Sequence, residues 1–164
     1  MGDSSRFILF SQYIKNNFPF TKYPTIADIA GGKGQLQIEL HKLGYDVTTY
    51  DKRHTRVSRN LKYKYSYFND SIKEKYSLLV GLHPDEATDI IITQAIKRKI
   101  PFCVIPCCIL PYATIYKGDT NRTSKNAYRS WINHLKQVAE SNKYKVILFE
   151  LPMKGKNIVI KGIP

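Results

Sequence analysis

Short apolar segments alternate regularly with amphipathic ones along this chain. The apolar segments have the length and composition of buried strands, and they lie at 25–30, 46–50, 63–68, 76–82 and 102–105. Two further strands are predicted at 144–150 and 157–161. Because the turn between these two is short, they must run antiparallel.

Segments with helical spacing separate most of these strands. Helices are predicted at 3–17, after Gly34, from Pro84 to about Lys99, and after Ser124, with an exposed loop at 111–123. Strands and helices in alternation are typical of a parallel sheet with helices on both faces. We therefore predict an α/β, Rossmann-like fold with a seven-stranded, mostly parallel sheet and an antiparallel last strand.

The length of the chain predicts a single domain. With 164 residues, 43% of them hydrophobic, the chain can bury one core, and residues 1–24 are predicted to form an N-terminal helical extension. No apolar stretch approaches the ~20 residues of a membrane span, and the run from Phe7 to Phe10 is too short for a signal peptide. We expect a cytoplasmic protein with no membrane partner.

Three cysteines lie close together, at Cys103, Cys107 and Cys108. An odd number within six residues does not form a disulfide framework, which agrees with a reducing compartment. With His83 they could bind a metal ion, but no CxxC pair or His-x-His spacing accompanies them, so no metal site is predicted.

The formal net charge of the chain is +13. A basic surface attracts phosphate groups, so RNA is one interpretation, and the amino-acid bias of an AT-rich genome is the other. The candidate RNA contacts are Arg53, Arg56, Arg59 and Lys62. They precede Tyr63, Tyr65 and Tyr67. Aromatic side chains beside cations suit stacked bases, although this alternation is also typical of a half-buried strand.

A glycine-rich turn joins the first predicted strand to the helix after it. The turn reads Asp28-Ile-Ala30-Gly31-Gly32-Lys-Gly34. Glycine lets the backbone approach a ligand closely, and the helix N-terminus offers unpaired N–H groups. The dinucleotide pattern Gly-x-Gly-x-x-Gly fails at Gln37, and no Gly-Lys-Ser/Thr of a phosphate loop follows.

Acidic residues are predicted at the carboxyl ends of three successive strands. Asp28, Asp51 and Asp70 end the first, second and third strands, which places them at one edge of the sheet. Asp51 stands where a Rossmann fold holds ribose hydroxyls, and Asp70 could accept a hydrogen bond from an adenine amino group. Helix caps and turn residues are the alternative interpretation of these acids.

Four motifs carry a resemblance to a known family. They are Ala27-Asp-Ile-Ala-Gly-Gly-Lys-Gly-Gln-Leu36, Val80-Gly-Leu-His-Pro-Asp-Glu-Ala-Thr88, Pro101-Phe-Cys-Val-Ile-Pro-Cys-Cys108 and Leu151-Pro-Met-Lys-Gly-Lys-Asn157. In this order they resemble small class I methyltransferases, whose turn reads acid-x-Gly-x-Gly-x-Gly; Ala30 takes the first glycine place here. The middle two motifs also resemble eukaryotic tRNA 2′-O-methyltransferases, which have Cys-Gly where this chain has Asp85 and Glu86.

The resemblance implies a cofactor and the residues that bind it. The cofactor is S-adenosyl-L-methionine. Its predicted contacts are Asp28, Ala30, Gly31, Gly32, Gly34, Asp51, Lys52, Asp70 and Leu82.

His83 and Asp85 are the candidate catalytic residues. They follow the fourth strand, beside which this fold places the acceptor, and His83 is the candidate base because its pKa lies near neutrality. Asp85 could hold the acceptor or orient His83. Each could instead serve the following helix, His83 as its cap and Asp85 in its first turn. Cys107 and Cys108 are predicted to be structural rather than nucleophilic.

Three functions remain open at this point. The first is an RNA methyltransferase acting on tRNA or rRNA. The basic segment that contains Arg53, Arg56, Arg59 and Lys62 favours it. The second is a methyltransferase of a small molecule or a protein, and the third is an inactive subunit that only binds the cofactor. For the first, a partner subunit is expected to select the target.

Overall fold

The computed structural model describes residues 4–53, 55–107 and 125–164. These residues form a seven-stranded sheet in the order β3-β2-β1-β4-β5-β7-β6. The strands are β1 (Thr25–Ile29), β2 (Asp46–Tyr50), β3 (Tyr63–Lys64), β4 (Leu78–Leu82), β5 (Phe102–Ile105), β6 (Lys145–Glu150) and β7 (Ile158–Ile163). β7 runs antiparallel to β5 and β6, and the other neighbouring strands are parallel. The predicted fold class is confirmed.

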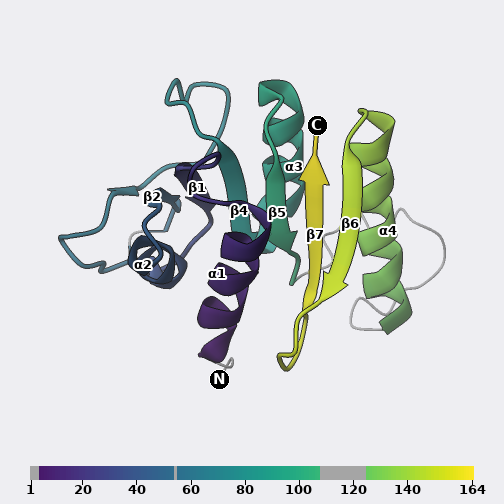
Figure 1. Cartoon of the computed structure of the whole chain (residues 1–164), viewed down its shortest axis with the longest axis horizontal. Helices are drawn as coiled ribbons and strands as arrows, with labels where there is room; N and C mark the ends of the chain where they lie inside the picture. The colour runs from purple at the N-terminus through teal and green to yellow at the C-terminus, as the bar shows by residue number, and fades with distance from the viewer. Residues whose placement is uncertain (1–3, 54, 108–124) are drawn as a thin grey trace.

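Helices cover both faces of the sheet (Figure 1). α1 (Ser5–Asn17) and α2 (Gln35–Lys42) pack on one face, and α3 (Thr88–Arg98) and α4 (Lys125–Ser141) pack on the other. Successive strand residues alternate between two hydrophobic clusters, as the two-residue period of a strand requires: Leu78 and Val80 face α1, and Leu79 faces α3. The N-terminal helix belongs to this core, because Phe10 and Ile14 are fully buried.

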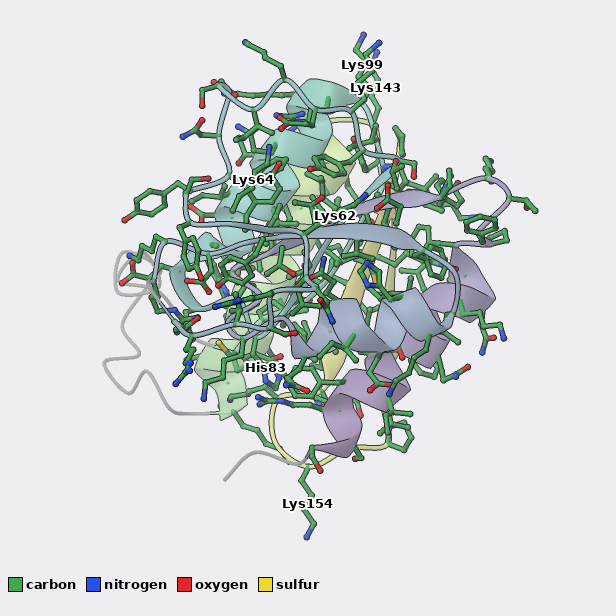
Figure 2. The ribbon with its side chains drawn as sticks, turned by 90° about the vertical axis from the view of Figure 1, so that its left-hand side faces the viewer. Lys62, Lys64, His83, Lys99, Lys143 and Lys154 are labelled. Carbon is green, nitrogen blue, oxygen red and sulfur yellow. The ribbon has the colours of Figure 1, made fainter. Side chains whose placement is uncertain are left out.

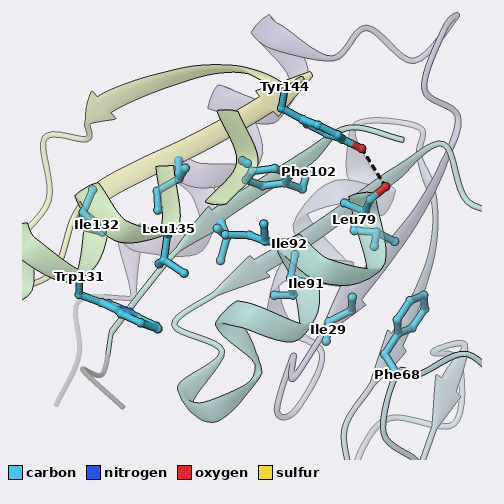
Figure 3. Packing of buried hydrophobic residues seen from close by; sticks show 14 of the residues in the cluster. Ile29, Phe68, Leu79, Ile91, Ile92, Phe102, Trp131, Ile132, Leu135 and Tyr144 are labelled. Atoms are coloured by element: carbon cyan, nitrogen blue, oxygen red, sulfur yellow. Dashed lines mark hydrogen bonds between the residues drawn. The ribbon is translucent and has the colours of Figure 1, made fainter. Parts of the chain in front are cut away.

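The last helix packs as its spacing predicts. Figure 3 shows Trp131, Ile132 and Leu135 of α4 beside Ile92 of α3 and Phe102 of β5, and all five are buried. Ser124, the predicted cap of this helix, the loop at 111–123 and Cys108 lie outside the described residues. No helix in the described part of the chain has the length and apolar character of a membrane span.

The third strand is shorter than predicted. The sequence indicates a strand at 63–68, but β3 ends at Lys64 because only Tyr63 and Lys64 pair with β2. Phe68 turns inward and packs edge-on against Tyr50, with ring centroids 4.9 Å apart. Tyr65 and Tyr67 stay 47% and 57% exposed. The half-buried-strand interpretation of residues 63–67 is therefore wrong beyond Lys64.

The helix after β4 also begins later than predicted. A single 3-10 turn, Asp85–Ala87, precedes α3, which starts at Thr88. This places Asp85 and Glu86 in an exposed turn at the end of β4 instead of inside a regular helix.

Candidate functional site

The carboxyl ends of β1, β2, β4 and β5 meet at one edge of the sheet. Among the residues that the structure describes, three non-glycine residues at this edge have positive φ: Ala30 at 57°, His83 at 53° and Asp85 at 47°. Such a backbone conformation costs about 1–3 kcal/mol per residue and is concentrated at ligand sites. The φ of Ala30 also gives the physical reason why glycine is the usual residue at this turn position.

A pocket of about 510 Å³ opens at this edge. Its walls are the turn at Ala30, the segment from Asp51 to Arg53, residues 66–68 and residues 84–87. This volume lies within the range of small-molecule sites. The pocket therefore brings together Ala30 of the glycine turn, the acid after β2 and the residues after β4, whereas Gly31, Gly32 and Gly34 are not among the residues that line it.

Asp28 lies beneath the glycine turn. It is fully buried, its Oδ2 accepts a hydrogen bond from Thr49 Oγ1 at 3.1 Å, and its Oδ1 has no hydrogen-bond partner in the part of the chain that the structure describes. Burial raises the pKa of Asp28 to about 7, against the opposing effect of the Thr49 hydrogen bond. A side chain at Gly31 would collide with this carboxyl group, so glycine is required there for the turn to cross it.

Asp51 is the central carboxylate of the pocket and is only 3% exposed. Gly32 N–H donates to its Oδ2 at 2.9 Å, and Arg53 N–H donates to its Oδ1 at 2.9 Å. The Arg53 guanidinium adds two bonds, from Nε to Oδ1 at 3.0 Å and from Nη2 to Oδ2 at 2.7 Å. Burial alone would raise the pKa of Asp51, but these hydrogen bonds outweigh it and hold the pKa below its usual range.

Asp70 does not reach the pocket. It lies six residues beyond the end of β3, on the surface, where it accepts hydrogen bonds from Gln94 Nε2 and Lys97 Nζ, both at 2.8 Å. The prediction that Asp70 ends the third strand is wrong, because that strand stops at Lys64. Tyr67 and Phe68 line the pocket on this side instead. An aromatic pair after a two-residue strand forms no motif, so the sequence gives no signal of its position.

Lys52 and Leu82, the other two predicted cofactor contacts, have different surroundings. Lys52 lines the pocket, with Nζ 5.1 Å from the centroid of the Tyr67 ring and 3.7 Å from Glu86 Oε2. Leu82 is 9% exposed and belongs to the hydrophobic cluster under α1.

His83 joins three segments of the chain at this edge. Its Nε2 lies 2.8 Å from the carbonyl oxygen of Lys156, in the β6–β7 turn, and its Nδ1 lies 3.3 Å from Nη1 of Arg6, on α1. A carbonyl only accepts and a guanidinium only donates, so Nε2 carries the proton and the ring is neutral. Burial lowers the pKa of His83 and favours this neutral form. Because Arg6 uses the Nδ1 lone pair, this geometry does not present His83 as a base ready to accept a proton.

Asp85 lines the pocket and is exposed. Its Oδ1 accepts a hydrogen bond from Cys107 Sγ at 3.2 Å, and its Oδ2 lies 3.7 Å from Nη1 of Arg53. Cys107 is half-buried and lies beside this acid. Cys103 is fully buried, and burial raises the pKa of its thiol. Within 4–53, 55–107 and 125–164, no three His, Cys, Asp or Glu side chains gather in a way that could hold a metal ion.

The basic side chains between β2 and β3 do not all lie on the same side of the molecule. Arg56 and Arg59 are exposed, but Lys62 Nζ pairs at 2.6 Å with Oδ1 of Asp46, which begins β2 and so lies at the opposite edge from the pocket. Figure 2 shows Lys99 and Lys143 at the far end of the molecule from His83. The positive charge is thus spread over both ends, and the structure separates Lys62 from Arg53.

The sequence and the structure were compared with those of known proteins. No protein-family model matches the sequence, and no curated protein matches it. Ribosomal protein L11 methylase from Lactobacillus delbrueckii subsp. bulgaricus matches the structure with a TM-score of 0.63 at 15% identity, over 99% of this chain and 79% of that chain. Human N-acetylserotonin methyltransferase in complex with SAM gives 0.58 at 14% identity, over 98% of this chain but 53% of that chain, so this chain spans about half of that enzyme.

A third match is magnesium protoporphyrin IX methyltransferase from Synechocystis PCC 6803 with bound SAM, with a TM-score of 0.59 at 9% identity over 98% of this chain and 78% of that chain. The chain has the fold of class I methyltransferases. The three matching proteins are named for different acceptors, namely a ribosomal protein, N-acetylserotonin and a porphyrin. The fold that these proteins share therefore does not specify an acceptor.

Proposed function

We propose that this chain is an S-adenosylmethionine-dependent methyltransferase and that its acceptor is RNA. The observation that carries the first part is the pair of buried acids at the glycine turn: Asp51 faces the pocket, and Asp28 lies beneath the turn with one oxygen that no described residue hydrogen-bonds. An unpaired buried carboxyl group is costly unless a ligand or a charge compensates for it.

The residues present fit the cofactor. Asp51 would hold the ribose hydroxyls. Asp28 is buried beneath the glycine turn, and its negative charge would favour the ammonium group of the methionine part on the other side of the turn. Tyr67 and Phe68 offer aromatic surface for the adenine ring. S-adenosylmethionine supplies an activated methyl group, and the protein contributes mainly the positioning of donor and acceptor.

Asp85 is a better candidate than His83 for the group that contacts the acceptor. Its carboxylate lines the pocket, whereas both ring nitrogens of His83 are engaged with Arg6 and Lys156. In this proposal, His83 is a positioning residue that fixes the backbone at the end of β4, and Asp85 orients the acceptor or takes its proton.

RNA is proposed as acceptor because of the segment that connects β2 to β3 and continues to residue 67. Arg56, Arg59, Tyr65 and Tyr67 are all exposed there, and Tyr67 also lines the pocket. Cations with accessible aromatic rings suit phosphates and unstacked bases. The second candidate is a small-molecule or protein methyltransferase, which the spread of lysines to the far end favours (Figure 2).

Methyl transfer from labelled S-adenosylmethionine tests the proposal. The protein is incubated with total RNA, with RNA-free protein extract and with a small-metabolite fraction, and the RNA is then digested for mass spectrometry of its nucleosides. We expect label in RNA and one methylated nucleoside that Asp85→Asn fails to produce. Label confined to the protein or metabolite fraction would contradict RNA as acceptor and support the second candidate.

The RNA part also predicts a specific salt dependence. Replacing Arg56 and Arg59 together by alanine is expected to reduce the slope of log affinity against log salt concentration by about one to two units, because each phosphate contact releases counterions. The matched control is Lys99→Ala with Lys143→Ala, at the far end of the molecule (Figure 2). Equal slopes for wild type and both double variants would leave Arg56 and Arg59 as solvated surface.

A further inference from the structure

The hydrogen-bonding capacity of Asp51 is already full in this structure. A carboxylate offers about four lone-pair sites. All are used: Oδ1 accepts from the backbone N–H and Nε of Arg53, and Oδ2 accepts from Gly32 N–H and Nη2 of Arg53. A ribose that binds Asp51 must therefore displace a donor.

The side chain of Arg53 is the donor that can leave. The other two donors are backbone N–H groups next to the carboxylate, whereas the Arg53 side chain is 51% exposed. Its guanidinium takes one lone pair on each oxygen, and a vicinal diol presents its two O–H groups to a carboxylate in the same way. The guanidinium thus fills the two acceptor positions that the ribose hydroxyls need.

Asp85 offers the displaced guanidinium a second carboxylate. Nη1 of Arg53 already lies 3.7 Å from Oδ2 of Asp85, too far for a good hydrogen bond but close enough for a side-chain rotation to form one. Both residues line the same pocket. Arg53 therefore lies between the acid after β2 and the acid after β4.

We propose that the guanidinium of Arg53 competes with the cofactor ribose for Asp51 and that cofactor binding transfers this guanidinium from Asp51 to Asp85. This inference rests on the proposed function, since it concerns the same cofactor. It has two consequences: Arg53 lowers the affinity for the cofactor, and the Arg53–Asp85 pair strengthens only when the cofactor is bound. Cofactor binding then changes the charge environment of the residue proposed to contact the acceptor.

Titration calorimetry with S-adenosylhomocysteine tests the competition. Arg53→Ala is expected to bind S-adenosylhomocysteine about threefold to tenfold more tightly than wild type, because a half-exposed ion pair no longer has to be broken. Arg53→Lys should fall in between, since an ammonium cannot fill both acceptor positions as a guanidinium fork does. The matched control is Arg129→Ala, which removes an exposed arginine from α4.

A double-mutant cycle tests the transfer to Asp85. Asp85→Asn is expected to weaken S-adenosylhomocysteine binding about twofold to threefold in the wild-type background and to have no effect in Arg53→Ala, because its only role in this step is to receive Arg53. Thermal melts establish that each variant is folded.

The possible outcomes distinguish a failure of the Arg53 proposal from a failure of the proposed function. Equal or weaker binding by Arg53→Ala, with clear binding by wild type, would overturn the competition and leave the proposed function intact. An equal effect of Asp85→Asn in both backgrounds would overturn the transfer. Absence of binding by every folded form would overturn the proposed function and this inference together.

Discussion

Asp51→Ala is expected to weaken binding of S-adenosylhomocysteine by about 100-fold, the largest effect that we predict for a single pocket residue. The carboxylate would accept two hydrogen bonds from the ribose, and a hydrogen bond to a charged group contributes about 1.5–3 kcal/mol. Two such bonds contribute about 3–6 kcal/mol. Displacing Arg53 subtracts the threefold to tenfold cost proposed above, which leaves roughly a factor of 100. Calorimetry measures the change directly.

Two variants control this prediction. Asp51→Asn keeps one acceptor oxygen at the same place, so its affinity should lie between those of wild type and Asp51→Ala. Asp70→Ala removes an acid that pairs with Gln94 and Lys97 on the surface, and it should leave the affinity unchanged. A loss for Asp70→Ala as large as that for Asp51→Ala would place the cofactor elsewhere than this pocket.

Asp28→Asn is expected to stabilise the protein, and by more at pH 8 than at pH 5. The pKa of Asp28 rises from 3.8 to about 7 on folding, so the folded state binds this proton more strongly than the unfolded state. The favourable contribution is fully present below pH 3.8 and is lost as pH rises to about 7. Asparagine has no such proton, so the variant lacks this loss.

The size of the effect follows from the pH window. Each pKa unit corresponds to about 1.4 kcal/mol, so the stability gain of Asp28→Asn should be greater at pH 8 than at pH 5 by about 2–3 kcal/mol. Urea unfolding of both proteins at the two pH values measures it. The control is Asp46→Asn, in an exposed pair with Lys62, which should change stability by less than about 1 kcal/mol at either pH.

A gain for Asp28→Asn that is equal at the two pH values would contradict the raised pKa of Asp28. If the gain comes with weaker binding of S-adenosylhomocysteine, it shows that Asp28 is retained at a cost in stability for the sake of the ligand. Functional sites commonly hold such residues, because the group that binds the ligand is unfavourable without it.

The sequence predicts most of the strands and helices well because they depend on local sequence patterns. Short apolar segments locate β2 and β5, and the helical spacing of apolar residues locates α4. The short turn between β6 and β7 makes these two strands antiparallel. Ala30 and Asp51 follow strands whose ends are clear in the sequence, so their meeting in one pocket follows from parallel-strand geometry alone.

The parts that the sequence predicts poorly depend on contacts between distant segments. Asp70 is held by α3, His83 is held by Arg6 and by the β6–β7 turn, and Lys62 is drawn to Asp46. None of these partners lies within ten residues in the sequence. The proposed competition between Arg53 and the ribose is different. Arg53 lies only two residues from Asp51, but the sequence does not show that its side chain fills the acceptor positions of the carboxylate.

Calorimetric titration of the wild-type protein with S-adenosylhomocysteine tests whether the pocket binds the methyl-donor cofactor. We predict one site per chain with a dissociation constant on the order of 1–10 µM, which corresponds to about −7 to −8 kcal/mol. NADH, a dinucleotide that the glycine turn is not built to hold, serves as the control and should give no heat. Folded protein that releases no heat with S-adenosylhomocysteine, or that binds NADH equally well, would contradict the assignment of this pocket to the methyl-donor cofactor.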